Sequence, residues 1–332
     1  MAFAATDKGV AVDVFFAFPD NLHFLTEAGR IDRIIPVELF EDLAGNYDLV
    51  MTVSQFVTVH RRLFDSVALS AMTPKLAALV DHIEHRQQPF AAYFESHPQF
   101  DGAFADEAIR CGASRRTFLS RMAGFPEPSD RLGITQSDLA SLPVELPARF
   151  ITIHDGWDTS FRIASRRPTK AYNIDQFAQV VALLKKRFPG YPIIQVGTTL
   201  GEHIPGVALD LRGKTSLADV AAIIGRAAAH IDIEGGLVHL AAALGARSVV
   251  MFGPTSVDYY AYPQNINLAP ALCGNCMWTV SQWMDFCPAG YEEAVCMRSI
   301  EPARVVEGAA RILAVATDNE QKMLSAKAKR VG

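Results

Sequence analysis

Residues 231–256 read IDIEGGLVHLAAALGARSVVMFGPTS, and this stretch decides the fold. The apolar run 231–233 predicts a short strand, which two glycines end. Residues 237–244 are rich in Leu and Ala and predict a helix that stops at Gly245 in the C′ position. Residues 248–252 are β-branched and apolar, as in a buried parallel strand, and a Gly-Pro-Thr-Ser loop follows them. The stretch therefore predicts a strand–helix–strand unit of an α/β sheet.

The glycine turn of this unit predicts a phosphate site. In open α/β sheets, ligands bind outside the carboxyl ends of the strands. Gly235 and Gly236 open the helix there, so a ligand can approach backbone N–H groups and the positive end of the helix dipole. We expect a nucleotide or a sugar phosphate at this turn.

The composition limits the class of protein. The chain has 332 residues, half of them hydrophobic and 20% charged, which predicts two well-packed domains. Its net charge of −5 argues against a general nucleic-acid binder. The sequence has no run of 18 apolar residues, so no membrane span is predicted. The first residues lack the pattern of a signal peptide, so we expect a cytoplasmic protein.

Predicted strands and helices alternate along the chain, which favours mostly parallel sheets. In the first half, strands are predicted at 12–18, 33–37 and 49–53, with mainly helical structure over 68–123. Four prolines in 125–147 mark a linker. We therefore expect one domain over 1–147 and a second over 148–332.

The second domain begins with a predicted strand at 150–153, and another follows at 192–196. Asn173 is placed to cap a helix with one apolar face. Ser216 and Asp219 have the spacing of a capping box at the start of another helix. These elements extend the α/β pattern to the glycine turn.

Three common motifs are missing. Residues 212–216 (RGKTS) resemble the end of a P-loop, but the glycine required earlier is replaced by Ala208. Neither the dinucleotide fingerprint G-x-G-x-x-G after the first strand nor the hydrolase motif G-x-S-x-G is found. These gaps weaken the NTPase, dehydrogenase and α/β-hydrolase interpretations.

Four of the five cysteines form the pattern C-x2-C-x10-C-x8-C. They are Cys273, Cys276, Cys287 and Cys296. A C-x2-C pair presents two thiolates to one metal, and two more complete a tetrahedral site suited to zinc or iron. We expect a structural metal that folds residues 273–296, with free or redox thiols as the alternative.

Residues 149–316 resemble the C-terminal half of glycosyltransferase family 9, the ADP-heptose heptosyltransferases. The resemblance rests on Thr169-Lys170 before a helix, on 211–217 (LRGKTSL) and on 235–256. The four cysteines make the chain similar to the autotransporter heptosyltransferases, which carry a four-cysteine iron finger. The resemblance implies a GT-B fold, in which two Rossmann-like domains face a cleft.

The resemblance also implies a donor site for an ADP-sugar. Thr169 and Lys170 match the pair that meets the donor's phosphates, and Lys170 would stabilise the leaving diphosphate. The glycine turn would hold the pyrophosphate, and its neighbour Glu234, where many family members have Asp, would reach the sugar. The remaining donor positions are Gly197, Thr198, Leu211 and Thr215 beside the nucleoside, and Gly235, Gly236 and His239 at the helix start.

The first half of the chain matches the family less well, because the usual first βα unit is missing or replaced. Its catalytic base must come from elsewhere, and Asp20 and Asp101 are the two candidates. Arg115 and Arg116 resemble part of an acceptor-side helix. They are predicted either to contact an anionic acceptor or to lie on a solvated helical face.

The function implied is inverting transfer of a heptose or related sugar from an ADP-sugar to a protein, such as an autotransporter, or to lipopolysaccharide. No catalytic divalent cation is expected, and a homo-oligomer is compatible with these features. Two alternatives stay open: a nucleotide-sugar epimerase with the GT-B fold, and a non-catalytic sugar-nucleotide-binding or assembly protein.

Overall fold

The computed structural model divides into two compact units, Met1–Ser129 and Asp130–Gly332. The structure describes residues 9–19, 25–26, 31–53, 57–88, 106, 108–124, 131, 142, 144–156 and 167–315. Within these residues, no helix is both long enough and apolar enough to cross a membrane.

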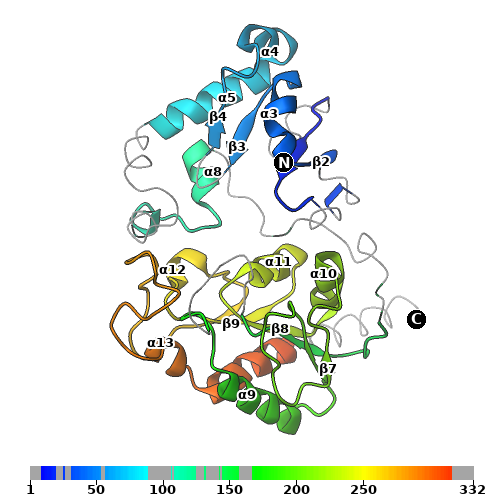
Figure 1. The fold of residues 1–332 in the computed structure, drawn as a ribbon, viewed down its shortest axis with the longest axis vertical. Helices are drawn as coiled ribbons and strands as arrows, with labels where there is room; N and C mark the ends of the chain where they lie inside the picture. The colour runs from blue at the N-terminus through cyan, green and yellow to red at the C-terminus, as the bar shows by residue number, and fades with distance from the viewer. Residues whose placement is uncertain are drawn as a thin grey trace, which may run out of the picture. The chain divides into compact units, whose positions relative to one another are not determined.

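The N-terminal unit combines two small sheets with helices (Figure 1). β1 pairs in parallel with β2, and β3 pairs in antiparallel with β4. The strands are β1 (Asp13–Phe16), β2 (Arg33–Pro36), β3 (Met51–Val53) and β4 (Val57–Val59). The helices are η2 (Val37–Leu39), α3 (Phe40–Leu43), η3 (Ala44–Asn46), α4 (Ser66–Met72), α5 (Pro74–Gln87) and α8 (Phe118–Ala123).

The antiparallel hairpin β3–β4 departs from the mostly parallel sheets that the sequence predicts. A glutamine side chain from α5 stabilises it: the Gln87 amide accepts from the Val57 N–H at 2.8 Å and donates to the Val57 carbonyl at 2.7 Å. The side chain thereby replaces a neighbouring strand along β4. Such a contact between distant segments leaves no periodic signal in the sequence.

The C-terminal unit is built on one parallel sheet of six strands with the order β10-β9-β8-β5-β6-β7. The strands are β5 (Ile151–Ile153), β6 (Ile193–Gln195), β7 (Leu209–Asp210), β8 (Ala229–Ile233), β9 (Ser248–Met251) and β10 (Ile266–Leu268). The helices are α9 (Ile174–Arg187), α10 (Leu217–Arg226), α11 (Gly236–Leu244), α12 (Val257–Tyr260), α13 (Val295–Arg298) and an unlabelled one over 302–315. The predicted parallel α/β architecture is confirmed for this unit.

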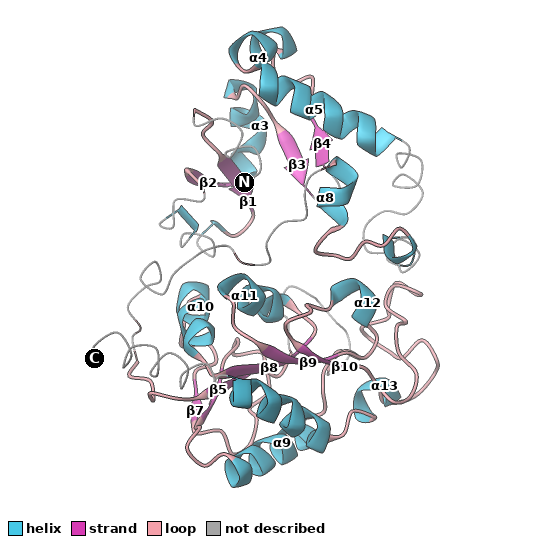
Figure 2. Ribbon diagram, turned by 180° about the vertical axis from the view of Figure 1, so that it is seen from behind, coloured by secondary structure: helices cyan, strands magenta, loops and turns pink. Residues whose placement is uncertain are grey.

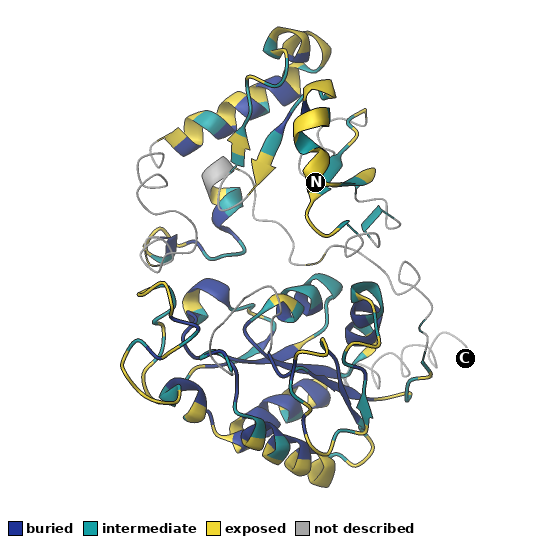
Figure 3. Ribbon diagram, viewed as in Figure 1, coloured by how far each residue is buried: buried dark blue, intermediate teal, exposed yellow. Residues whose placement is uncertain are grey.

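Helices cover both faces of this sheet (Figure 2). On one face, apolar residues of β5 and β8 pack against α9 and the helix over 302–315, including Phe177, Leu184 and Ile312. On the other face, Ile194 and Val196 pack against α10 and α11. The four inner strands β5, β6, β8 and β9 are therefore buried on both sides (Figure 3), as is typical of strands in a parallel sheet.

Three predicted helix ends are confirmed. The Asn173 side chain accepts from the Asp175 N–H at the start of α9. Gly245 ends α11 in the left-handed conformation with φ 77°. Ser216 and Asp219 form a reciprocal capping box at α10. Local signals thus set the helix boundaries in this unit.

Replacing Ser216 by Ala tests the contribution of the capping box. The substitution removes the hydroxyl that accepts from the Asp219 N–H at 3.1 Å. We expect the free energy of unfolding to fall by about 1 kcal/mol, measured by chemical denaturation. Ser216→Thr keeps the hydroxyl and should lose less; equal losses in both variants would contradict the capping role.

Candidate functional site

The sheet order places a ligand crevice between two central strands. The chain runs from β5 outward to β6 and β7, and then returns to the other side of β5 to form β8, β9 and β10. The order therefore reverses between β5 and β8, and ligands of doubly wound sheets bind outside the carboxyl ends at this point. The segments that follow these two strands are 154–156 and 234–236.

The glycine turn after β8 leaves open space at the start of α11. A Cβ at Gly236 would meet no atom within 4 Å, and one at Gly235 would meet only the Ile233 carbonyl oxygen at 4.0 Å. The φ of Gly235 is 175°, which is extended backbone. The first turn of α11 is therefore approachable, as an anion site requires.

Two side chains flank this turn. The Glu234 carboxylate, nine-tenths buried, lies 3.8 Å from Nε2 of His239. The other ring nitrogen of His239, Nδ1, lies 2.9 Å from the Tyr262 hydroxyl. The predicted pair Glu234 and His239 is thus brought together, and Tyr262 fixes the orientation of the imidazole.

A buried polar network joins β5 and β8 beneath the crevice. The Asp232 carboxylate is 1% exposed and lies 3.0 Å from Nδ1 of His154 and 3.3 Å from Nε2 of His230. His230 in turn lies 3.0 Å from the Thr152 hydroxyl. In β8 the apolar residues face the α9 side, so the alternation of the strand directs His230 and Asp232 to the opposite face.

The histidines determine the charge of this network. Burial alone would raise the pKa of Asp232, but the charges and hydrogen bonds of His154 and His230 lower it to about 2. The carboxylate is therefore ionised at neutral pH. It holds His154 at the carboxyl end of β5, where the imidazole Nε2 lies 3.8 Å from Asp155.

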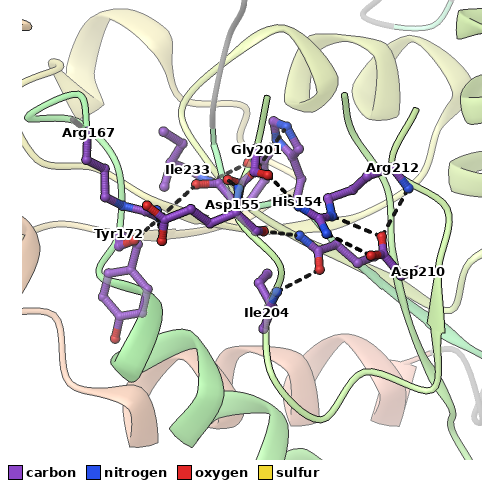
Figure 4. Close-up of polar contacts among 12 residues, drawn as sticks. His154, Asp155, Arg167, Tyr172, Gly201, Ile204, Asp210, Arg212 and Ile233 are labelled. Atoms are coloured by element: carbon purple, nitrogen blue, oxygen red, sulfur yellow. Dashed lines mark hydrogen bonds and ion pairs between the residues drawn. The ribbon is translucent and has the colours of Figure 1, made fainter. Parts of the chain in front are cut away.

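Asp155 anchors two loops to the same strand end (Figure 4). Its Oδ2 accepts from the Glu202 N–H at 2.7 Å, and a Cβ at Gly201 would lie 2.6 Å from its Oδ1. Its carbonyl accepts from Arg167, which also donates to the Tyr172 carbonyl at 2.6 Å. The loop after β6 and the segment before α9 are thus tied to β5.

The predicted nucleoside loop follows β6 and β7. Gly197 has φ 137°, and a Cβ there would lie 2.9 Å from the His154 ring, so glycine lets the loop lie against the imidazole. Leu211 is buried, and its carbonyl accepts from the Thr215 hydroxyl at 3.4 Å. Thr198 completes the predicted set at the carboxyl end of β6.

An ion pair fixes this loop. Arg212 donates to both carboxylate oxygens of Asp210, at 3.0 and 2.8 Å, and these bonds lower the pKa of Asp210 to about 2. Arg212 also donates to the Gly201 carbonyl. The loops after β6 and β7 are therefore held together.

Thr169 and Lys170 lie in a turn before α9, where the Ala171 N–H donates to the Pro168 carbonyl at 2.9 Å. Both hydrogen-bond donors of Thr169 are taken up by backbone carbonyls of another loop. Its N–H donates to the Met284 carbonyl at 2.9 Å and its hydroxyl to the Trp283 carbonyl at 2.6 Å. The turn is thereby joined to the loop that carries the cysteines.

The four cysteines of this loop influence one another electrostatically. Burial raises the pKa of the Cys276 thiol, and Cys273 and Cys287 raise it further. Burial likewise raises the pKa of Cys296 to about 11, with smaller contributions from the other three thiols. Four thiols sharing one neighbourhood suit a soft metal ion. Among the described residues, however, no three His, Cys, Asp or Glu side chains are arranged as metal ligands.

Of the four site residues predicted for the N-terminal unit, the structure describes two. The candidate bases Asp20 and Asp101 lie outside the described residues. Arg115 and Arg116 lie in the turn before α8 and are half-buried. Asp13 of β1 is bound by Arg33 and Tyr47; burial raises its pKa, but these two residues lower it overall.

Sequence reasoning missed the polar residues that hold the crevice together. Their signal is the alternation of β8, AHIDI, which is typical of a half-exposed strand although all five residues are buried. Polar side chains facing the interior of a parallel sheet require partners, and His154 directly follows β5. The residues missed are Thr152, His154, Asp155, Arg167, Asp210, Arg212, His230, Asp232 and Tyr262.

Comparison with known proteins supports one family. Residues 159–272 match the sequence model of glycosyltransferase family 9 (heptosyltransferase), and this match indicates a glycosyltransferase enzyme. No curated protein is similar enough in sequence to count as a relative.

Several solved structures are similar to the chain. Escherichia coli ADP-heptose lipopolysaccharide heptosyltransferase II aligns over 95% of this chain and 93% of its own, with 15% identity and a TM-score of 0.50. At that identity the likeness concerns the fold alone.

Two further structures cover less. The iron-containing dodecameric glycosyltransferase TibC from enterotoxigenic E. coli H10407 aligns over 59% of this chain and 52% of its own, with 20% identity and a TM-score of 0.42. A family 9 glycosyltransferase from Veillonella parvula DSM 2008 aligns over 51% and 47%, with 18% identity and a TM-score of 0.36. The aligned part is thus about half the length of both proteins.

Replacing Asp232 by Asn tests the buried network. The pKa of Asp232 is lowered from 3.8 to about 2 in the folded state, so its stabilisation is complete above pH 4 and is lost as the pH falls towards 2. We expect Asp232→Asn to lower the free energy of unfolding at pH 7 by about 2 kcal/mol. The difference from the wild type should shrink below pH 4.

Denaturant unfolding at a series of pH values measures this effect. Asp258→Asn, at an exposed position in α12, is the matched control and should change the stability little. A difference for Asp232→Asn that stays constant from pH 7 to pH 3 would contradict the assigned charge.

Proposed function

We propose that the chain is a heptosyltransferase that moves a heptose, or a related sugar, from an ADP-sugar to a protein or lipopolysaccharide acceptor with inversion at the anomeric carbon. The observation that carries the proposal is the open glycine turn after β8, which lies at the reversal of strand order and is flanked by Glu234 and His239. The match to the heptosyltransferase family and the fold shared with ADP-heptose lipopolysaccharide heptosyltransferase II support the choice of donor.

In this proposal the C-terminal unit binds the donor. The start of α11 and Lys170 neutralise the diphosphate as it leaves, while Glu234 contacts sugar hydroxyls. The loops after β6 and β7, held by Asp155 and by the Arg212–Asp210 pair, border the nucleoside.

The acceptor belongs to the N-terminal unit in the same proposal. Asp20 and Asp101 remain the candidates for the general base that removes the acceptor's hydroxyl proton, and Arg115 and Arg116 for contacts with an anionic acceptor. No divalent cation is assigned to the reaction. We place the enzyme in the cytoplasm, where ADP-sugars would be its donors.

Binding of ADP tests the donor site. We expect ADP to raise the melting temperature, because a ligand that binds only the folded state stabilises it by about 2.7 kcal/mol at 100 times its Kd. Lys170→Ala should remove most of this shift, since the lysine compensates the phosphate charge. Thermal denaturation with and without ADP measures both.

Lys186→Ala, on the exposed side of α9, is the matched control and should keep the full ADP shift. No shift with any nucleoside diphosphate would contradict donor binding. Isomerisation of a nucleotide sugar without an acceptor would favour an epimerase. Binding without transfer to any acceptor tested would favour a non-catalytic binding protein.

We also propose that the four cysteines hold a structural iron or zinc ion. The soft-ligand chemistry of the four thiols supports this, as does their closeness, since they affect one another electrostatically. Thiolate ligands must lose their protons, so a bound ion would reverse the raised pKa values. The ion would tie together a loop that consists mostly of turns.

Elemental analysis of protein purified without chelators tests the metal. We expect about one iron or zinc per chain, and its loss when Cys273 and Cys276 are both replaced by Ser. Cys111→Ser is the matched control, because this exposed cysteine lies outside the loop. A wild-type protein without either metal would rule the ion out.

A further inference from the structure

One residue, Thr169, holds the turn at 168–171 against residues 273–296, which we call the cysteine loop. Thr169 has two hydrogen-bond donors, its backbone N–H and its hydroxyl. The N–H donates to the Met284 carbonyl at 2.9 Å and the hydroxyl to the Trp283 carbonyl at 2.6 Å. Both acceptors are consecutive carbonyls of the cysteine loop, so the two segments meet along a short ladder.

This pairing changes what Thr169 can do for a diphosphate. Ionised phosphate oxygens only accept hydrogen bonds, and a hydroxyl has a single proton to donate. Since that proton is directed to the Trp283 carbonyl, Thr169 has no hydrogen bond left to donate to the phosphates of a sugar nucleotide in this arrangement. Lys170, the next residue, is the charged group of the turn.

The far side of the cysteine loop is fixed to another part of the crevice. The Asn275 N–H donates to the Gly253 carbonyl at 3.0 Å, and the Met277 N–H to the Pro254 carbonyl at 2.9 Å. These carbonyls belong to the loop that follows β9. A Cβ at Gly253 would lie 3.3 Å from the Cys296 sulfur. The cysteine loop therefore bridges the turn that carries Lys170 and the carboxyl end of β9.

The acceptor carbonyls are firmly placed. Trp283 is 2% exposed and Met284 7% exposed, and the Trp283 ring packs edge-on against Trp278 at 5.6 Å between centroids. Cys287, three residues after Met284, is also buried. The two carbonyl groups are held by buried residues, and Thr169 lies in a tight turn. A movement of one segment would therefore displace the other.

We propose that Thr169 is a positioning residue. It holds the turn that carries Lys170 against the cysteine loop, a contact we call the latch, so that nucleotide binding is coupled to the accessibility of the cysteines. The coupling to the donor rests on the proposed function, whereas the latch itself does not. Because coupling between two sites is reciprocal, a nucleotide at the crevice protects the cysteine loop, and loosening the loop weakens nucleotide binding.

The experiment follows the alkylation rate of each cysteine by mass spectrometry, with and without ADP, in protein from which a chelator has removed any iron or zinc. Exposed Cys111, in the N-terminal unit, is the internal reference. We expect Thr169→Val to speed the alkylation of Cys287 relative to Cys111 roughly two- to tenfold, the range for a lost hydrogen bond. Thr169→Ser, which keeps the hydroxyl, should restore the wild-type rate.

The ADP arm measures the coupling. ADP should slow the alkylation of Cys287 in the wild type and in Thr169→Ser, while Thr169→Val should lose this protection and bind ADP more weakly. Thr279→Val is the matched control: it removes a hydroxyl-to-carbonyl bond of 2.7 Å within the same loop without touching the turn. It should keep both ADP binding and protection.

Two results would overturn the latch. One is Thr169→Val with weaker ADP binding and unchanged alkylation of Cys287, which identifies a direct phosphate contact. The other is unchanged alkylation in both Thr169 variants. If the wild type binds no ADP, the proposed function fails, and the alkylation rates without nucleotide still decide whether the latch exists.

Discussion

The ionised carboxylate of Asp232, buried between two histidines, is the interaction on which the arrangement of the C-terminal unit depends. A charge taken out of water is costly unless it is paired and hydrogen-bonded. His230 from the same strand and His154 from beyond β5 satisfy this need. The network therefore adds a side-chain contact to the backbone register of the β5–β8 pair, which is where the strand order reverses.

The residues that follow β5 connect this network to the loops around the crevice. His154 lies under the loop at Gly197, which must lack a Cβ to pass the ring. Asp155, next in sequence, holds the Glu202 N–H and, through its carbonyl, Arg167. The loops that border the crevice are thus positioned by side chains at the end of one strand. Such rigid support by packed elements is what a binding site requires.

The sequence predicted the parts of this unit that depend on local patterns. The helix caps at Asn173, Ser216 and Gly245 and the buried apolar strands have short-range signals, and the structure confirms them. The network of Asp232 was not predicted, because its partners are separated by up to 78 residues. Strand β4 of the hairpin was not predicted because its three residues are too few to show an alternating pattern, and the Gln87 that supports it lies 30 residues away.

Thr169 shows where a resemblance to a family stops being informative. A motif places a residue near a ligand, but the hydrogen bonds of its side chain depend on whatever else packs against it. In this chain the additional packing partner is the cysteine loop, whose carbonyls at Trp283 and Met284 take up both Thr169 donors. An electropositive turn that is fixed through a neighbouring loop, rather than by its ligand, is already in place before the ligand binds. Such preorganisation lowers the entropy cost of binding, and it makes the order of the cysteine loop a condition for the order of the turn.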